Sequence, residues 1–428
     1  MNRLKVLFHR TQQAEPIRMG TLVWHDRRAW FEFDSQFLDL GFNPSPLLLE
    51  KTIKPQPAQI SHFGGLHSVF HDCLPDGWGR FIMDRYFAQC GVPSDEITPL
   101  DRLAFIADRG MGALSFDPPH PMTPTKNSSD PFDLTDAAST ARDLYEGLLS
   151  RVSRSFASNG TPAAGGQPKL LIGYNGTETV EGSGLLPDDF SHWLVKISPA
   201  INPNVQWAGT IEYVYALLAQ KAGILMSGVR LVRDEDRYSY FLTRRFDRKS
   251  LGQRVFVQSA SALLNVDSRN AELDYSDLLK LSDILTRNYA QKLFLFRQMV
   301  FNIISGNRDD NLRNFAFMLA ENDEWSCTPA YGISWNTGMA GKHAMSVNGH
   351  RKDISRNDVL EVAKRSSITK RDATAILDRV GTTLRSGESL LREHGVSNHL
   401  SQDIIRYVER QQRAMTPASA VNIETGSD

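Results

Sequence analysis

Asn307-Arg308-Asp309-Asp310-Asn311-Leu312-Arg313-Asn314 is the most informative segment of the chain. It places a carboxylate, Asp309, five residues before an amide, Asn314. A phosphoryl-transfer site needs a carboxylate that orients an acceptor hydroxyl and takes its proton, and an amide oxygen that can meet the metal on the nucleotide phosphates. Asp309 and Asn314 are candidates for these roles. An acidic cluster in a loop can also be a solvated turn, so support must come from elsewhere in the chain.

The spacing fits the catalytic-loop pattern H-R-D-x-x-x-x-N of protein kinases, with Asn307 in place of the histidine. Upstream features occur in the order that a kinase requires. Gly165 and Gly166 provide backbone that can approach phosphates closely, and Lys196 lies in a Val-Lys strand step. Glu212, on the next predicted helix, can hold that lysine. Taken singly, the glycines could form only a flexible loop, the lysine could lie on an edge strand, and the glutamate could face solvent. Their occurrence together, in the order found in kinases, favours a kinase.

Composition bounds the function. A chain of 428 residues predicts two or three domains, and 41% hydrophobic residues can fill large cores. A net charge of -1 predicts no general attraction to nucleic acid or membrane, so any DNA contact would be local or through a partner. Cys73, Cys90 and Cys327 fit neither a disulfide framework nor a CxxC metal site. The amino terminus lacks a signal-peptide pattern and no stretch approaches transmembrane length, so we expect a soluble, cytoplasmic protein.

Residues 3–152 predict a small sheet followed by helices. Residues 3–33 predict a small antiparallel sheet with a turn at Asp26-Arg27, and residues 74–80 predict a turn that opens a helix. Residues 117–131 are rich in Pro, Thr, Ser and Asn and predict a surface linker. A short helix is expected near 144–152.

After residue 152 the chain predicts strands first and then helices. Strands are expected at 170–172, 193–197 and 238–246, with a hairpin at Asn175-Gly176. Beyond about Leu263 the patterns are almost entirely helical. The fold class is therefore α+β. The expected domains are an amino-terminal subdomain (1–120), a kinase small lobe (121–250), a helical large lobe (251–415) and a mobile tail (416–428).

Five stretches together resemble the HipA-family toxins of type II toxin–antitoxin systems. They are 74–80, 112–114, 165–169, 241–248 and 307–315. The resemblance covers nearly the whole chain. It implies a two-lobed, protein-kinase-like (HipA-like) fold with a sheet-rich amino-terminal lobe and an all-helical carboxyl-terminal lobe.

The resemblance also implies a function. Members of this family are serine/threonine protein kinases that use ATP and Mg²⁺ to phosphorylate translation components such as aminoacyl-tRNA synthetases, and thereby arrest growth, a route to persistence. They are restrained by a small helix-turn-helix antitoxin of the HipB type. DNA would be reached only indirectly, through that antitoxin.

Carried over by motif, the resemblance implies a role for each site residue. Asp309 would be the catalytic base, Asn314 a metal ligand, and Glu212 the partner of Lys196. The implied ATP-binding residues are Ala164, Gly165, Gly166, Gln167, Lys169, Lys196, Arg244, Arg245, Phe246 and Asn311.

Two departures from the family pattern stand out. The family carries an Asp in the tripeptide equivalent to D-F-G, where this chain has Gly332, which has no side chain to hold magnesium. The alternative function is therefore a catalytically inactive, kinase-like protein that binds the antitoxin or a target. Relatives often carry an autophosphorylated Ser where this chain has Pro162, and the nearest hydroxyls, Thr161 and Ser158, are possible phosphosites.

Three other site types compete with this interpretation. His67 and His71, with Cys73 nearby, invite a zinc site but lack an evident further ligand. Asp309 and Asp310 could be metal ligands of a hydrolase, although no His cluster supports that. Arginines between 244 and 248 could touch DNA phosphates, although a kinase hinge strand explains them equally well.

Overall fold

The computed structural model describes residues 1–10, 15–124, 132–162, 165–198, 206–233, 238–267, 273–320 and 322–417. The chain divides into two compact units. Unit 1 comprises Met1–Gly209, Gly228–Asp267 and Ala316–Thr328. Unit 2 comprises Thr210–Ser227, Ser268–Phe315 and Pro329–Asp428.

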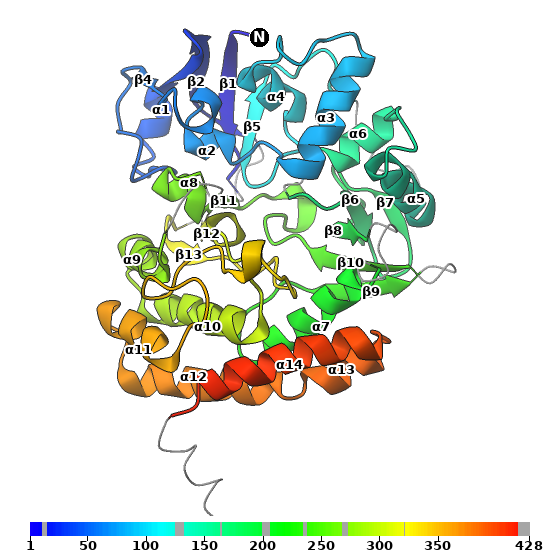
Figure 1. Ribbon diagram of the computed structural model, residues 1–428. Coiled ribbons are helices and arrows are strands. Elements are labelled where there is room, and N and C mark those ends of the chain that lie inside the picture. Colours follow the sequence, from blue (N-terminus) through cyan, green and yellow to red (C-terminus); the bar gives the residue numbers. More distant parts are fainter. Residues whose placement is uncertain are drawn as a thin grey trace, which may run out of the picture. The chain divides into compact units, whose positions relative to one another are not determined.

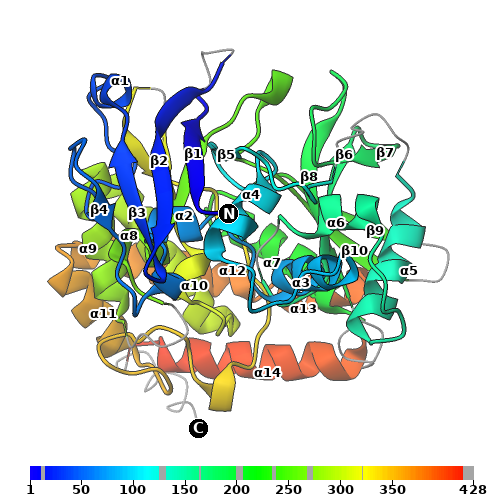
Figure 2. The ribbon, with the colours of Figure 1, turned by 90° about the horizontal axis from the view of Figure 1, so that it is seen from above.

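The amino-terminal part of unit 1 is an antiparallel sheet, in which β1, β2 and β3 lie side by side (Figure 2). Its strand order is β4-β3-β2-β1-β5. The strands are β1 (Arg3–Phe8), β2 (Ile17–His25), β3 (Arg28–Phe33), β4 (Gln56–Pro57) and β5 (Leu114–Asp117). Asp26 and Arg27 both have positive φ, 50° and 58°, as a two-residue hairpin turn requires. The predicted sheet and turn are confirmed.

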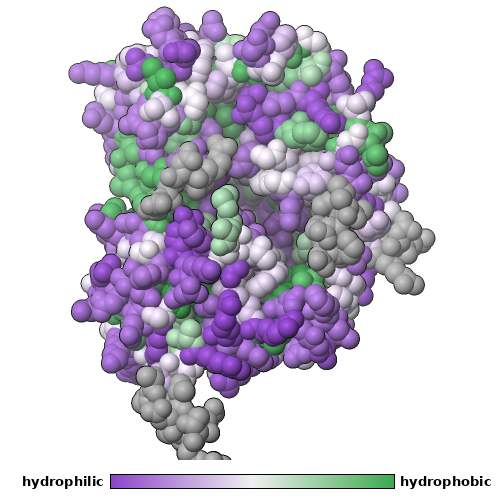
Figure 3. Space-filling model, viewed as in Figure 1, coloured by the Kyte–Doolittle hydropathy of each residue, from purple (hydrophilic) through white to green (hydrophobic). Residues whose placement is uncertain are grey.

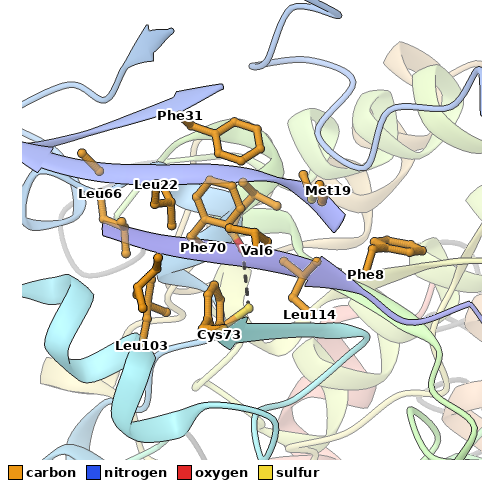
Figure 4. Packing of buried hydrophobic residues seen from close by; sticks show 14 of the residues in the cluster. Val6, Phe8, Met19, Leu22, Phe31, Leu66, Phe70, Cys73, Leu103 and Leu114 are labelled. Atoms are coloured by element: carbon orange, nitrogen blue, oxygen red, sulfur yellow. Dashed lines mark hydrogen bonds between the residues drawn. The ribbon is translucent and has the colours of Figure 1, made fainter. Parts of the chain in front are cut away.

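One face of this sheet carries a hydrophobic core (Figure 4). Val6 and Phe31 alternate with more exposed residues along β1 and β3, and both are fully buried, as is Leu22 of β2. Helices α1 (Ser35–Leu38), α2 (Ser68–His71) and α4 (Pro99–Ile106) belong to the same unit. Phe70 of α2 and Leu103 of α4 join the cluster.

The second sheet of unit 1 has the order β7-β6-β8-β10-β9. Its strands are β6 (Lys169–Tyr174), β7 (Thr179–Glu181), β8 (Ser191–Ile197), β9 (Val229–Arg233) and β10 (Ser239–Arg244). The strands predicted from the sequence and the hairpin at Asn175-Gly176 are confirmed. The helices α3 (Gly77–Gln89), α5 (Leu134–Tyr145) and α6 (Arg154–Gly160) contribute to a core with this sheet.

The helix expected near 144–152 is wrong in its position, because α5 ends at Tyr145. Gly147 adopts a left-handed φ of 77°, and the Leu148 N–H donates to the carbonyl of Asp143 at 2.8 Å. This is a Schellman ending, which uses glycine to terminate a helix.

A third, antiparallel sheet completes unit 1. It consists of β11 (Phe256–Ser259), β12 (Ala316–Leu319) and β13 (Trp325–Cys327), and α8 (Ala260–Leu264) follows β11. Strands β12 and β13 correct the expectation that the chain beyond Leu263 is almost entirely helical. They have four and three residues, too few for alternation to stand out in the sequence.

Unit 2 is helical (Figure 1). Its helices are α7 (Ala208–Lys221), α9 (Tyr275–Thr286), α10 (Tyr289–Ser305), α11 (Arg356–Arg365), α12 (Lys370–Leu384), α13 (Gly387–Glu393) and α14 (Asn398–Ala414). The predicted buried helix is α10, which packs against α9, α12 and α14. The surface over α11, α12 and α14 in Figure 3 is mainly hydrophilic, as expected for helices with one buried face. None of the helices in the described ranges has the length and apolar composition to cross a membrane.

Candidate active site

The catalytic-loop octapeptide follows α10 in unit 2. Helix α10 ends at Gly306, a left-handed residue with φ of 77°. The Asn314 side chain then donates from Nδ2 to the carbonyl of Asp309 at 2.5 Å, and Asn311 donates from Nδ2 to Asp309 Oδ1 at 2.8 Å. Asp309 is exposed. The fold thus brings the predicted base and the predicted metal ligand together.

Asp310 is placed quite differently from its neighbour. It is 1% exposed. Its Oδ2 accepts hydrogen bonds from the Tyr275 hydroxyl at 2.8 Å and from His343 Nδ1 at 2.9 Å, and its Oδ1 accepts from the Ala344 N–H at 2.7 Å. Both carboxylate oxygens are therefore occupied by protein donors, which argues against a hydrolase site in which Asp309 and Asp310 hold a metal together.

Arg308 links the loop to the segment after Gly332. Its Nη1 donates to the carbonyl of Thr337 at 2.8 Å. Its guanidinium lies over the Tyr407 ring of α14, 4.5 Å from the centroid, a cation–π contact. The chain before Asp309 is thereby fixed to two other segments of unit 2.

Gly332 lies directly beside Asn314. A Cβ built on Gly332 would be 3.3 Å from both Cγ and Oδ1 of the Asn314 side chain. Asn307 Nδ2 also points to the Gly332 carbonyl, at 3.5 Å. A carboxylate at position 332 would therefore lie next to the amide that is predicted to bind the metal.

The fit of unit 2 to a magnesium ion is partial. Asn314 offers an amide oxygen, which suits this cation, but Gly332 offers no ligand. Within the described part of the chain, no group of three His, Cys, Asp or Glu side chains is placed to hold a metal.

In unit 1, the phosphate-loop residues are held by the turn before α3. The Trp78 N–H donates to the Gly165 carbonyl at 2.9 Å, and Asp76 Oδ1 accepts from the Gly165 N–H. Trp78 Nε1 donates to the Lys169 carbonyl at 3.0 Å. A Cβ on Gly77 would lie 2.7 Å from the Gly165 carbonyl oxygen, so this approach requires glycine.

Two lysines lie opposite each other beside this loop. Lys169 of β6 pairs in register with Lys196 of β8, so their side chains share one face of the sheet. Lys169 is 4% exposed, and its Nζ lies 2.6 Å from where a Cβ on Gly165 would be. Lys196 Nζ lies 6.0 Å from the Phe241 ring centroid. The register therefore places the two lysines that are predicted to bind the nucleotide phosphates on one face, and their role stays a prediction.

The remaining residues that are predicted to bind ATP differ in how exposed they are. Gln167 and Arg244 are exposed and Phe246 is half-buried. Ala164 lies outside the described residues. Lys196 belongs to unit 1 and Glu212, 6% exposed, to unit 2, and their pairing stays a prediction.

Arg245 is part of a buried ion cluster that sequence reasoning missed. Arg245 Nη2 and Arg248 Nη1 lie 2.7 and 2.8 Å from Asp247 Oδ2, which also accepts from the Gly112 N–H at 2.8 Å. Burial alone would raise the pKa of the Asp247 carboxyl, but the two guanidinium groups outweigh it and hold that pKa well below its usual range. Arg245 and Arg248 are thus engaged inside the protein, which disfavours the DNA-contact alternative. The sequence did contain a hint of this cluster, because Gly112 and the Arg-Arg-Phe-Asp-Arg run lie in two of the stretches that resemble the HipA family, 112–114 and 241–248.

The possible phosphosites are both buried. Thr161 is 0% exposed and donates from Oγ1 to the Ala157 carbonyl at 2.8 Å. Ser158 is 1% exposed, and its Oγ lies 2.8 Å from Ser183 Oγ. Modification of either would require this part of unit 1 to open.

The zinc alternative receives no support from the geometry of His67. Its Nε2 lies 3.0 Å from the Gln56 carbonyl and donates to it as N–H, which removes that nitrogen as a ligand. Burial lowers the pKa of His67 to about 4, only partly offset by the bond to Gln56.

The two units define a two-lobed, protein-kinase-like α+β fold. The family model for the HipA-like C-terminal domain matches residues 161–387, and that for the HipA N-terminal domain matches residues 13–117. The chain belongs to the HipA family.

One solved structure supports this fold. HipA of Shewanella oneidensis MR-1, from a complex with HipB and operator DNA, matches with a TM-score of 0.70 and 17% identity over 96% of each chain. The Helicobacter pylori proinflammatory kinase CtkA matches less well, with a TM-score of 0.38 and 13% identity over 60% of this chain and 95% of that one. A comparison with curated proteins finds no match.

Proposed function

We propose that this chain is a HipA-type toxin: a cytoplasmic serine/threonine protein kinase that transfers the γ-phosphate of ATP to a translation component of the aminoacyl-tRNA synthetase class and so arrests growth. We further propose that Gly332 lowers the transfer rate of this particular chain. The observation that supports the proposal is the hydrogen bond from Asn314 Nδ2 to the backbone carbonyl of Asp309, which joins the proposed metal ligand to the residue that carries the proposed base.

The residues of each unit have separate tasks in this proposal. In unit 1, Lys169, Lys196 and the Gly165 backbone bind and orient the nucleotide phosphates. In unit 2, Asp309 takes the proton of the acceptor hydroxyl, assisted by the amide of Asn311, which holds its carboxylate. Asn314 would hold a magnesium ion, and such an ion would supply charge neutralisation on the phosphates.

The proposed partner is a HipB-like helix-turn-helix antitoxin. The solved Shewanella protein is in a complex with HipB and operator DNA, which supports a similar assembly here. With a net charge of -1, this chain would reach DNA only through the antitoxin.

Gly332 favours a second candidate function. Without the carboxylate, the chain could act by binding the antitoxin or a target without catalysis. Nucleotide binding would survive in that case, because Lys169 and Lys196 lie in unit 1, apart in sequence from the missing ligand.

Labelled ATP separates the two functions. The chain, its Gly332→Asp variant and the Gly332→Asp/Asp309→Ala double variant are each incubated with Mg²⁺ and bacterial cell extract. A kinase predicts that Gly332→Asp labels a discrete protein and that the double variant does not. Equal labelling by the chain and by Gly332→Asp would show that position 332 does not limit transfer. Absence of labelling by every version would reject the kinase and leave the binding protein.

A further inference from the structure

A set of buried polar side chains lies beneath the catalytic loop of unit 2. It begins at Asp310, whose two carboxylate oxygens accept three hydrogen bonds from Tyr275, His343 and Ala344. Tyr275 is 0% exposed and His343 is 3% exposed. A buried carboxylate is tolerated only where such donors replace its water, so this arrangement is sensitive to the loss of any member.

The same set of hydrogen bonds extends to Gly332, which lies beside Asn314. Asn302 of α10 donates from Nδ2 to the Tyr275 hydroxyl at 3.1 Å. Asn307 donates from Nδ2 to Asn302 Oδ1 at 3.0 Å, and the same group points to the Gly332 carbonyl at 3.5 Å. The hydrogen bonds therefore run from Asp310 through Tyr275 and two asparagines to Gly332.

These contacts constrain the backbone on both sides of Asp309. Asp310 anchors the loop to the start of α9 and to the segment at His343, whereas Asn307 anchors it to α10. The side chain of Asp309 is exposed and its carboxylate contacts Asn311 of its own loop. The backbone position of Asp309 thus depends in part on the buried side chains of Asn307 and Asp310, and misplacement by about 1 Å can cost about 100-fold in rate.

We propose that Asp310 is a positioning residue: its buried carboxylate, held by Tyr275, His343 and Ala344, fixes the backbone of Asp309 and the spacing between the catalytic loop and position 332. The kinetic part rests on the proposed kinase function. The structural part does not, because it concerns only contacts within unit 2.

Hydrogen exchange tests the structural part without any activity. The Asp310→Asn variant should exchange the backbone amides of residues 307–314 about tenfold faster than the unmodified chain. Asp358→Asn is the control, because Asp358 lies in the same unit and accepts bonds from Ser355 and Asn348, neither of which belongs to residues 307–314. Unchanged exchange at 307–314 in a folded Asp310→Asn protein, or an equal increase in the control, would overturn the proposal.

A milder variant keeps the test decisive if Asp310→Asn does not fold. Tyr275→Phe preserves the ring and removes one bond to Asp310, so it should raise exchange at 307–314 by a smaller factor. If Tyr275→Phe leaves that exchange unchanged while Asp310→Asn cannot fold, the carboxylate is only a stability element and the proposal is rejected.

Kinetics in the Gly332→Asp background test the catalytic part. Asp310→Asn should lower kcat about tenfold while leaving KM for ATP unchanged, because the lysines of unit 1 are untouched. An unchanged kcat, or a rise in KM alone, would contradict positioning. If Gly332→Asp is itself inactive, the kinase function fails, whereas the exchange result still decides the role of Asp310.

Discussion

Gly332 and Asn314 lie side by side, with 3.3 Å between the Asn314 carboxamide and the point where a Cβ on Gly332 would be. Gly332 has a φ of +65°, a conformation in which Asp is among the better-tolerated side chains. Restoring Asp there requires a shift of a few tenths of an ångström in the Asn314 side chain. The space beside Asn314 therefore admits an Asp at position 332 with a small side-chain shift, although the positive φ adds some backbone strain.

The paired lysines of unit 1 should govern nucleotide affinity. Lys169→Met removes a buried ammonium group beside Gly165 and should raise the Kd for ATP about tenfold or more, the loss of one charge-assisted hydrogen bond. Titration calorimetry measures this directly. Lys54→Met, at an exposed position of the same unit, is the control and should bind as the unmodified chain does. An equal Kd for Lys169→Met would remove this lysine from the nucleotide site.

We expect the stability of unit 1 to depend on a glycine at position 77 for two reasons: its close approach to Gly165 and its positive φ. Its φ is +46°, and an added Cβ would lie 2.7 Å from the Gly165 carbonyl oxygen. Gly91, after the other end of α3, has a φ of +79° with open space around it. We expect Gly91→Ala to cost about 1 kcal/mol of unfolding free energy, from backbone conformation alone.

Gly77→Ala should cost about 1–3 kcal/mol more, because backbone atoms must move apart. Denaturant unfolding compares the two variants, and ATP titration should show weaker binding only for Gly77→Ala. Equal unfolding free energies and equal ATP affinities would mean that the Gly77–Gly165 approach has no role.

His67 should make unit 1 sensitive to mild acid. Burial lowers the pKa of His67 to about 4, so an unfolded chain, with its His pKa near 6.5, takes up a proton first as pH falls. This contribution to stability is complete above about pH 6.5 and is lost progressively toward pH 4. Between pH 7 and pH 5 the loss should be roughly 2 kcal/mol.

Denaturant unfolding at these two pH values, in the unmodified chain and in His67→Gln, measures the effect. The variant should lose less stability on acidification. His25→Gln alters a side chain that is 70% exposed and should change nothing. If His67→Gln and the unmodified chain respond identically to pH, His67 is not the group that titrates.

The sequence predicted those parts of the site that depend on local pattern. The octapeptide 307–314, the glycine loop and the strands carrying Lys169 and Lys196 are each recognisable within a few residues. The contacts that hold these parts in place could not be predicted, because the hydrogen bonds to Asp310 come from Tyr275 and His343, which are 35 and 33 positions away in the sequence. Likewise, Asp76 meets Gly165 across 89 positions. The opposition of the two lysines depends on strand register, which no single segment encodes.

The most direct test of the central claim compares two residues of nearly equal shape at position 332. Gly332→Asp and Gly332→Asn both add a side chain beside Asn314, but only the first adds a negative charge. Initial rates of phosphoryl transfer from ATP at saturating Mg²⁺ should be about 100-fold higher for Gly332→Asp than for Gly332→Asn, with Asn close to the unmodified chain. Equal rates for the two variants would contradict the claim that the missing carboxylate at position 332 limits phosphoryl transfer by this chain.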